Sequence, residues 1–213
     1  MYIPRANEEK RIPVLHQLIK AEPLAALVTL SSGGLFASHL PMVLEEEGTA
    51  LGILRGHVSR ANLQWRDLNP SVDALAIFSG PQHYITPSWY PSTLEDGKEV
   101  PTWNYVVVHA YGSLKVIEDQ EWLMHHLEQL TDQSEAKAAI PWKVSDAPQD
   151  FIHSLLNGIV GFELPINKLE GKWKVSQNRS DRDKHGVIEG LDALNTPESL
   201  NMKKLVLDRS RTS

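Results

Sequence analysis

Three short segments of the chain gather side chains that can bind a ligand. The first follows an apolar run and reads Gly56-His57-Val58-Ser59-Arg60-Ala61-Asn62. Its glycine permits close backbone approach, and its polar residues supply donors at a turn that leads into a helical stretch, where phosphate groups are held well. A solvated turn with one salt-bridged arginine explains the same residues. The candidate phosphate ligands are His57, Ser59, Arg60 and Asn62.

The second segment, Trp173-Lys174-Val175-Ser176-Gln177-Asn178-Arg179-Ser180, follows a late apolar stretch. It combines an aromatic ring, two cations, two amides and two hydroxyls, and no apolar periodicity continues after Val175. A helix N-cap at Ser180 or Asp181 explains only its end. We therefore interpret it as a binding loop rather than a surface loop, and its candidate ligands are Trp173, Ser176, Gln177, Asn178 and Arg179.

The third is a pair of aromatic strings, His83-Tyr84-Ile85-Thr86-Pro87-Ser88-Trp89-Tyr90 and Val100-Pro101-Thr102-Trp103-Asn104-Tyr105. Flat side chains beside hydroxyl and amide groups suit a planar, partly polar ligand. Trp and Tyr are also enriched at subunit interfaces, so a dimer contact is an alternative that does not exclude a ligand site. The strings predict one wall of a site, with Trp103 and Asn104 facing the ligand.

Composition excludes several classes of function. The 213 residues carry 21 Lys and Arg against 27 Asp and Glu, a formal charge of -6, so no global basic field favours nucleic acid. The absence of cysteine removes disulfides, thiolate metal sites and thiol nucleophiles. No HExxH, GxGxxG, P-loop or GxSxG pattern occurs, and no apolar run is long enough to span a membrane. We expect a cytoplasmic protein without a metal.

The pattern of apolar residues predicts the elements that position these segments. A short helix is expected after Pro13, a hairpin over 25–43, strands over 51–58, 74–78 and 105–117, and one late strand over 158–169. Helices are expected over 118–133 and 149–156, within a helical insertion at about 118–157, and in a tail at about 181–213 that is interrupted at Pro197. Strands in hairpin order predict a single domain over 1–213, mainly β with peripheral helices (α+β). A small antiparallel barrel of this kind is filled by its own side chains, so a sizeable ligand binds outside it or between subunits.

These strings, together with Met1-Tyr2-Ile3-Pro4 and Trp65, resemble those of a known family. It is the PaiB-type family of FMN-binding negative transcriptional regulators, of the protease synthase and sporulation type. The resemblance implies a split β-barrel of antiparallel, Greek-key type and a homodimer with FMN in a groove between the subunits, as in the related pyridoxamine-phosphate oxidases. It implies that His57, Ser59, Arg60 and Asn62 lie at the phosphate, that Ser38, His39 and Leu40 run beneath the isoalloxazine, and that Trp103, Asn104 and Trp173 border it. Asn62 stands about where those oxidases carry a lysine, so the phosphate clamp is expected to depend on Arg60, with Arg179.

The resemblance implies a negative transcriptional regulator, but the sequence contains no helix-turn-helix with a basic recognition helix. DNA as a partner is therefore inherited from the resemblance alone. The alternatives are a flavin-dependent oxidoreductase and a flavin protein that acts through partner proteins. Candidate proton donors such as His83, Tyr84 and Tyr105 form no recognisable acid/base constellation, so the catalytic residues are unknown and a regulator is favoured over a dedicated enzyme.

Overall fold

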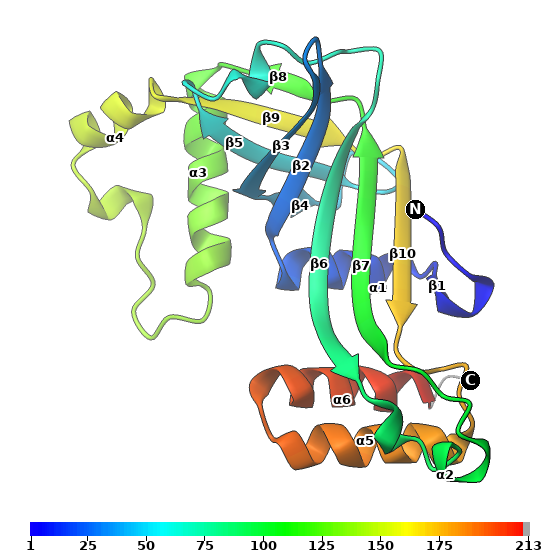
Figure 1. The fold of residues 1–213 in the computed structure, drawn as a ribbon. Helices are drawn as coiled ribbons and strands as arrows, with labels where there is room; N and C mark the ends of the chain where they lie inside the picture. Colours follow the sequence, from blue (N-terminus) through cyan, green and yellow to red (C-terminus); the bar gives the residue numbers. More distant parts are fainter. Residues whose placement is uncertain (211–213) are drawn as a thin grey trace. The chain divides into compact units, whose positions relative to one another are not determined.

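The computed structural model describes residues 1–210, so the last three residues of the predicted C-terminal tail lie outside the described residues. Within them, ten strands form two antiparallel sheets, as the fold class predicted from the sequence requires (Figure 1). The strands are β1 Glu8–Glu9, β2 Leu24–Ser31, β3 Gly34–Pro41, β4 Val43–Glu45, β5 Ile53–Ser59, β6 Ala74–Ile85, β7 Thr102–Gly112, β8 Lys115–Ile117, β9 Ile159–Pro165 and β10 Lys168–Lys174. The helices are α1 Ile12–Ala21, α2 Thr93–Asp96, α3 Gln120–Glu135, α4 Gln149–Leu156, α5 Asp181–Leu194 and α6 Pro197–Ser210.

One sheet has six strands in the order β1-β10-β7-β6-β2-β3, and the other has four in the order β4-β5-β9-β8. The chain divides into two compact units, each of which is discontinuous in sequence. Unit 1 comprises residues 1–11, 79–108 and 170–213, and unit 2 comprises residues 12–78 and 109–169. The division into two compact units does not test whether the chain is a single domain, so the single domain over 1–213 stays a prediction.

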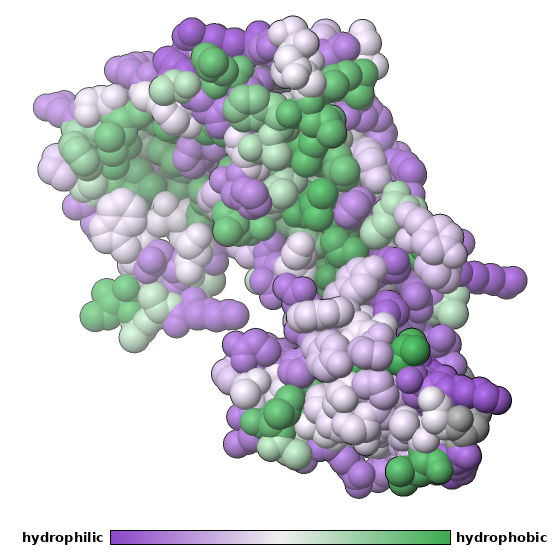
Figure 2. Space-filling model, viewed as in Figure 1, coloured by the Kyte–Doolittle hydropathy of each residue, from purple (hydrophilic) through white to green (hydrophobic). Residues whose placement is uncertain are grey.

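Unit 2 is built on the β2–β3 hairpin and the β5–β9 pair. The hairpin register runs from Leu24 opposite Pro41 to Ser31 opposite Gly34, where φ of +111° requires the glycine that ends the turn. Alternate residues of β2 point inward, so Ala25 and Leu27 are fully buried. Helices α3 and α4 belong to this unit, and Figure 2 shows hydrophobic side chains gathered over the part of it where they lie.

Unit 1 holds the first aromatic string against a helix with two glycines. Gly186 and Gly190 lie four residues apart in α5, and a Cβ on Gly190 would come within 2.3 Å of the Trp89 ring. The two glycines therefore form the surface on which Trp89 packs. The next residue of the string, Tyr90, is buried beneath the guanidinium of Arg179, which lies 4.5 Å from the ring centroid.

Three predicted strands were wrong. The strand predicted over 105–117 is two strands, β7 and β8, which belong to different sheets. The strand predicted to end at residue 78 continues as β6 to Ile85, so the start of the aromatic string is extended chain. The single late strand predicted over 158–169 is two strands, β9 and β10, which belong to different sheets. Pro165 ends β9, and the following backbone N–H groups of Ile166 and Asn167 donate to the carbonyl oxygens of Gly52, just before β5, and of Tyr111 in β7.

Candidate functional site

A pocket of about 540 Å3 lies in unit 2 between β3, β5 and the start of β9. Six of the predicted cofactor ligands line it: Ser38, His39, Leu40, His57, Ser59 and Asn62. Hydrophobic side chains from strands and helices complete the wall, including Val58, Leu127, Leu155 and Ile159. We call this cavity the β3–β5 pocket. Its volume is in the range of pockets that hold cofactors and drug-sized ligands.

Close packing of β3 on β5 shapes the floor of the pocket. A Cβ on Gly56 would lie 2.8 Å from Leu40 Cδ1 and 3.4 Å from the carbonyl oxygen of Pro41. Glycine at this position therefore lets the two strands approach while the flanking side chains still reach the cavity. A side chain at position 56 would displace the end of the Leu40 side chain, which lines the pocket.

Hydrogen bonds fix the polar groups at the mouth of the pocket. Asn62 Nδ2 donates to Ser38 Oγ over 2.8 Å, and Asn62 Oδ1 accepts from the backbone N–H of Gln64, which caps the short 3-10 helix Leu63–Trp65. Because Ser38 Oγ accepts from Asn62, its own O–H remains available to a ligand. Asn62 therefore orients the Ser38 hydroxyl as well as capping the 3-10 helix.

Arg60 does not line the pocket, and its guanidinium already has partners. Its guanidinium donates to the carbonyl oxygens of Asn157 and Ile159 and forms an ion pair with Glu118. The pocket wall therefore offers neutral donors and two histidines for an anion. The role of Arg60 as a phosphate clamp stays a prediction.

The second predicted loop and the Trp103–Asn104 pair belong to unit 1, where most of them are tied to their own surroundings. Asn104 Nδ2 donates to Ser176 Oγ over 2.9 Å, and this buried bond holds Ser176 at a φ of +63°, an uncommon conformation for a serine. Arg179 binds both carboxylate oxygens of Glu99, at 2.6 and 2.8 Å. Trp103 is 53% exposed and Asn178 is exposed. Of this group, these two side chains are the most open to a ligand.

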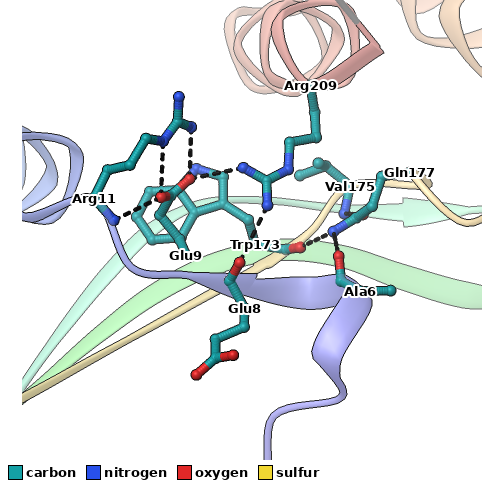
Figure 3. Close-up of polar contacts among 8 residues, drawn as sticks. All are labelled: Ala6, Glu8, Glu9, Arg11, Trp173, Val175, Gln177 and Arg209. Carbon is teal, nitrogen blue, oxygen red and sulfur yellow. Dashed lines mark hydrogen bonds and ion pairs between the residues drawn. The ribbon is translucent and has the colours of Figure 1, made fainter. Parts of the chain in front are cut away.

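Figure 3 shows the environment of two further residues predicted as ligands, Trp173 and Gln177. Trp173 is buried, and Gln177 Nε2 donates to the backbone oxygens of Trp173 and Ala6. Beside them lies a carboxylate cluster in which Glu9 accepts from the guanidinium of Arg11 at 2.6 and 2.9 Å and from that of Arg209 at 2.7 Å. Trp173 and Gln177 therefore help to pack β1 and β10 together with α6.

No sequence motif indicated the partner that lies behind His57. His57 Nδ1 and His126 Nε2 are 3.1 Å apart, and His126 is buried against the ring of Trp122. Burial lowers the pKa of His57 below its ordinary value. Burial and, secondarily, repulsion from His57, Arg55 and His125 lower the pKa of His126 to about 3. The spacing of His126 from Leu123 on the apolar face of the helix could have identified it as an inward-facing residue.

Two features are absent from the described part of the chain. Residues 1–210 contain no group of three or more His, Asp or Glu side chains arranged to hold a metal ion. None of the helices described there combines the length and apolar character needed to cross a membrane.

Comparison with known proteins identifies the family. Residues 1–168 match the family model described as "Putative FMN-binding domain". An uncharacterised protein of Emericella nidulans is 34% identical over 98% of this chain and 97% of its own length. The protease synthase and sporulation protein PAI 2 of Bacillus subtilis is 31% identical over 98% of both chains.

Solved structures show the fold. The FAD and heme binding protein of Mycobacterium smegmatis gives a TM-score of 0.56 at 16% identity, and the match covers 79% of this chain and 73% of that one. The flavocytochrome Anf3 of Azotobacter vinelandii gives 0.54 at 15% identity, with 81% and 72% covered. These likenesses confirm the split-barrel fold predicted from the sequence, and the family model confirms FMN as the predicted cofactor. The β3–β5 pocket fits such a group, because it combines apolar walls with the Ser38 hydroxyl and the Asn62 amide.

Proposed function

The chain belongs to the family described as Putative FMN-binding domain, and on that premise we propose that it is an FMN-binding homodimer that acts as a PaiB-type negative regulator of transcription. One observation carries the location of the cofactor: the β3–β5 pocket collects six of the predicted ligands from two strands and the turn that follows β5. The proposal places the protein in the cytoplasm.

In this proposal, some pocket residues make polar contacts with FMN and others make apolar contacts. Ser38 and His57 donate hydrogen bonds, and Asn62 holds the Ser38 hydroxyl in place. Leu40 and Ile159 present flat apolar surface to the ring system and exclude water from it. When bound, FMN supplies a ring that accepts and releases electrons. The protein determines its position and its surroundings.

An exposed face of β3 supports the homodimer. Within the described residues β3 is the last strand of the six-stranded sheet, so one edge of its backbone pairs with no other strand. Leu35 is 81% exposed, and Phe36 is also exposed. A second copy of the chain that covers this edge would bury these side chains and close the pocket that β3 lines. Light scattering or analytical ultracentrifugation of the FMN-bound protein measures this directly, and a strictly monomeric species contradicts the homodimer.

Direct binding of DNA depends on the relationship to the sporulation protein rather than on charge. Basic residues of the C-terminal region are paired with carboxylates: Arg182 with Glu95, Lys184 with Asp181, Lys203 with Asp192 and Arg209 with Glu9. Such pairing reduces the field available to a phosphate backbone. A gel shift with promoter and random DNA at increasing salt tests the repressor role, and equal weak binding to both would contradict it.

The alternative function is a flavin-dependent oxidoreductase, and His57 at the wall of the pocket is the observation that favours it. A neutral imidazole beside a flavin can donate a hydrogen bond to a substrate or to the ring. Reduction of the bound flavin by NADH or NADPH, followed by reoxidation by an acceptor, would support this function. A flavin that stays oxidised with every nicotinamide donor would count heavily against it.

A pair of variants on one helix tests the location of the cofactor. Leu155 lines the pocket and is half exposed, so Leu155→Trp fills part of the cavity while the rest of α4 stays in place. Phe151 is equally exposed on the same helix and does not line the pocket, which makes Phe151→Trp the matched control. We expect Leu155→Trp to weaken FMN binding at least about ten-fold in a flavin-fluorescence titration, since a rigid ring in the cavity competes with the ligand. Equal affinity in the two variants would place FMN elsewhere.

A further inference from the structure

His57 reaches the β3–β5 pocket with a second histidine directly behind it. The 3.1 Å contact between His57 Nδ1 and His126 Nε2 is a hydrogen bond, and the two rings meet edge to face with their planes 71° apart. His126 is 1% exposed and stacks on Trp122 with ring centroids 5.3 Å apart. The geometry fixes both rings, so the His57 Nδ1 edge faces His126 and the Nε2 edge is the one available to a ligand.

Only one of the two nitrogens in contact carries a proton. Burial lowers the pKa of both histidines, so both rings are neutral near pH 7, and a neutral imidazole carries its proton on only one nitrogen. Charged and titratable groups that act on His126 are Arg55 of β5 and His125 of α3, and both disfavour a positive charge there. Either His126 Nε2–H donates to His57 Nδ1, or His57 Nδ1–H donates to His126 Nε2.

The far nitrogen of His126 distinguishes the two arrangements. His126 Nδ1 is buried and has no hydrogen-bond partner among the described residues. If His57 were the donor, His126 would carry its proton on Nδ1, which would be a buried N–H without an acceptor. If His126 is the donor, Nδ1 is only a bare lone pair, which is tolerated better inside a protein than an orphaned N–H. A proton on His57 Nδ1 therefore carries a high cost, whereas a proton on His126 Nε2 leaves His57 Nδ1 as the acceptor.

We propose that His126 is a positioning residue that donates to His57 Nδ1 and thereby fixes His57 as an Nε2–H donor to a hydrogen-bond acceptor of the ligand in the β3–β5 pocket. Ser38 is a second donor at the same pocket, because its oxygen already accepts from Asn62. The pocket thus takes a ligand that presents acceptor atoms, such as carbonyl oxygens, ring nitrogens or phosphate oxygens. Identification of that ligand as FMN rests on the proposed function, whereas the tautomer does not.

Imidazole 15N NMR of the ligand-free protein measures the tautomer. We expect His57 Nε2 to carry the proton and Nδ1 to lack it in the wild type. His126→Phe keeps a ring to stack on Trp122 but removes the donor, so His57 should populate both tautomers and FMN affinity should fall about five-fold. His126→Gln returns an N–H near the position of Nε2 and should restore both. His125→Phe, at the exposed neighbouring position, is the matched control and should change neither.

Each outcome decides the proposal. A wild-type His57 with its proton on Nδ1 overturns it, as does a His126→Phe variant that retains both the wild-type tautomer and the wild-type affinity for FMN. Should His126→Phe fail to fold, the wild-type spectrum still determines the tautomer, and a His126→Gln variant in which His57 carries its proton on Nδ1 would overturn the proposal. Absence of FMN binding in the wild type would refute the proposed function, while the tautomer would still be read from the ligand-free spectrum.

Discussion

The buried carboxylate of Glu9 predicts a stability difference that depends on pH. Burial raises the pKa of this group, but hydrogen bonds and charge interactions with Arg11 and Arg209 outweigh burial and lower the pKa from its ordinary 4.5 to about 2. The side chain is only 2% exposed, so solvent screens these interactions little. At about 1.4 kcal/mol per pKa unit the difference corresponds to about 3 kcal/mol of unfolding free energy.

The sign follows from the direction of the shift. Because the folded-state pKa lies below the unfolded-state pKa, the ionised carboxylate stabilises the protein above about pH 4.5, and this contribution is lost as the pH falls toward about 2. Glu9→Gln removes the charge at every pH. We therefore expect the variant to be less stable than the wild type by about 3 kcal/mol at neutral pH and by almost nothing at about pH 2.

Urea unfolding followed by tryptophan fluorescence measures the difference, since Trp173 lies beside the cluster (Figure 3). Glu8→Gln is the matched control, because Glu8 is the neighbouring carboxylate and forms an ion pair with the exposed Lys10. That variant should lose at most about 1 kcal/mol. A Glu9→Gln effect that is below about 1 kcal/mol at neutral pH, or that is unchanged in acid, would refute the reasoning.

Three further substitutions test other contacts. Ser38→Ala removes a pocket hydroxyl and should weaken FMN binding about five-fold in a flavin-fluorescence titration, whereas an unchanged affinity would show that the hydroxyl makes no contact with FMN. Gly186→Ala places a methyl group 2.0 Å from the carbonyl oxygen of Trp89, so thermal unfolding should show a loss of about 1–3 kcal/mol; a wild-type melting temperature would contradict this packing. Arg179→Met leaves the mostly buried Glu99 without its guanidinium partner and should cost about 2 kcal/mol in urea unfolding, part of which the added Glu99→Gln change should recover; additive losses would contradict the pairing.

The sequence predicted the elements well where local chemistry decides them. Pro13 and Pro23 bracket α1, the break at Pro197 separates α5 from α6, and the turn at Ser32-Gly33 joins β2 to β3. Proline and glycine act within a few residues of themselves, so their effect is visible without any tertiary information. The corner at Pro165 was missed because Ile166 and Leu169 extend the apolar pattern past the polar pair Asn167-Lys168.

The site was predictable in part for the same reason. His57, Ser59 and Asn62 are close in sequence, and the turn after one strand brings them to one pocket. The partners of Arg60 and Arg179 were not predictable, since Glu118 and Glu99 lie 58 and 80 residues away. Nothing in the local pattern around an arginine indicates which distant carboxylate will reach it. Candidate cationic ligands are therefore the residues that sequence reasoning places least well.

The discontinuity of unit 1 has a consequence for the order of events during synthesis. All of unit 2 lies within residues 12–169, so β9 can pair with β5 while the C-terminal helices are still being translated. The Glu9–Arg209 contact joins residues 200 positions apart, and at about 5–20 residues per second the ribosome needs about 2–8 s to extend the chain from residue 169 to Arg209. Throughout that interval the Glu9 carboxylate lacks one of its two arginine partners. The first strand, β1, is therefore among the last elements to gain all of its contacts.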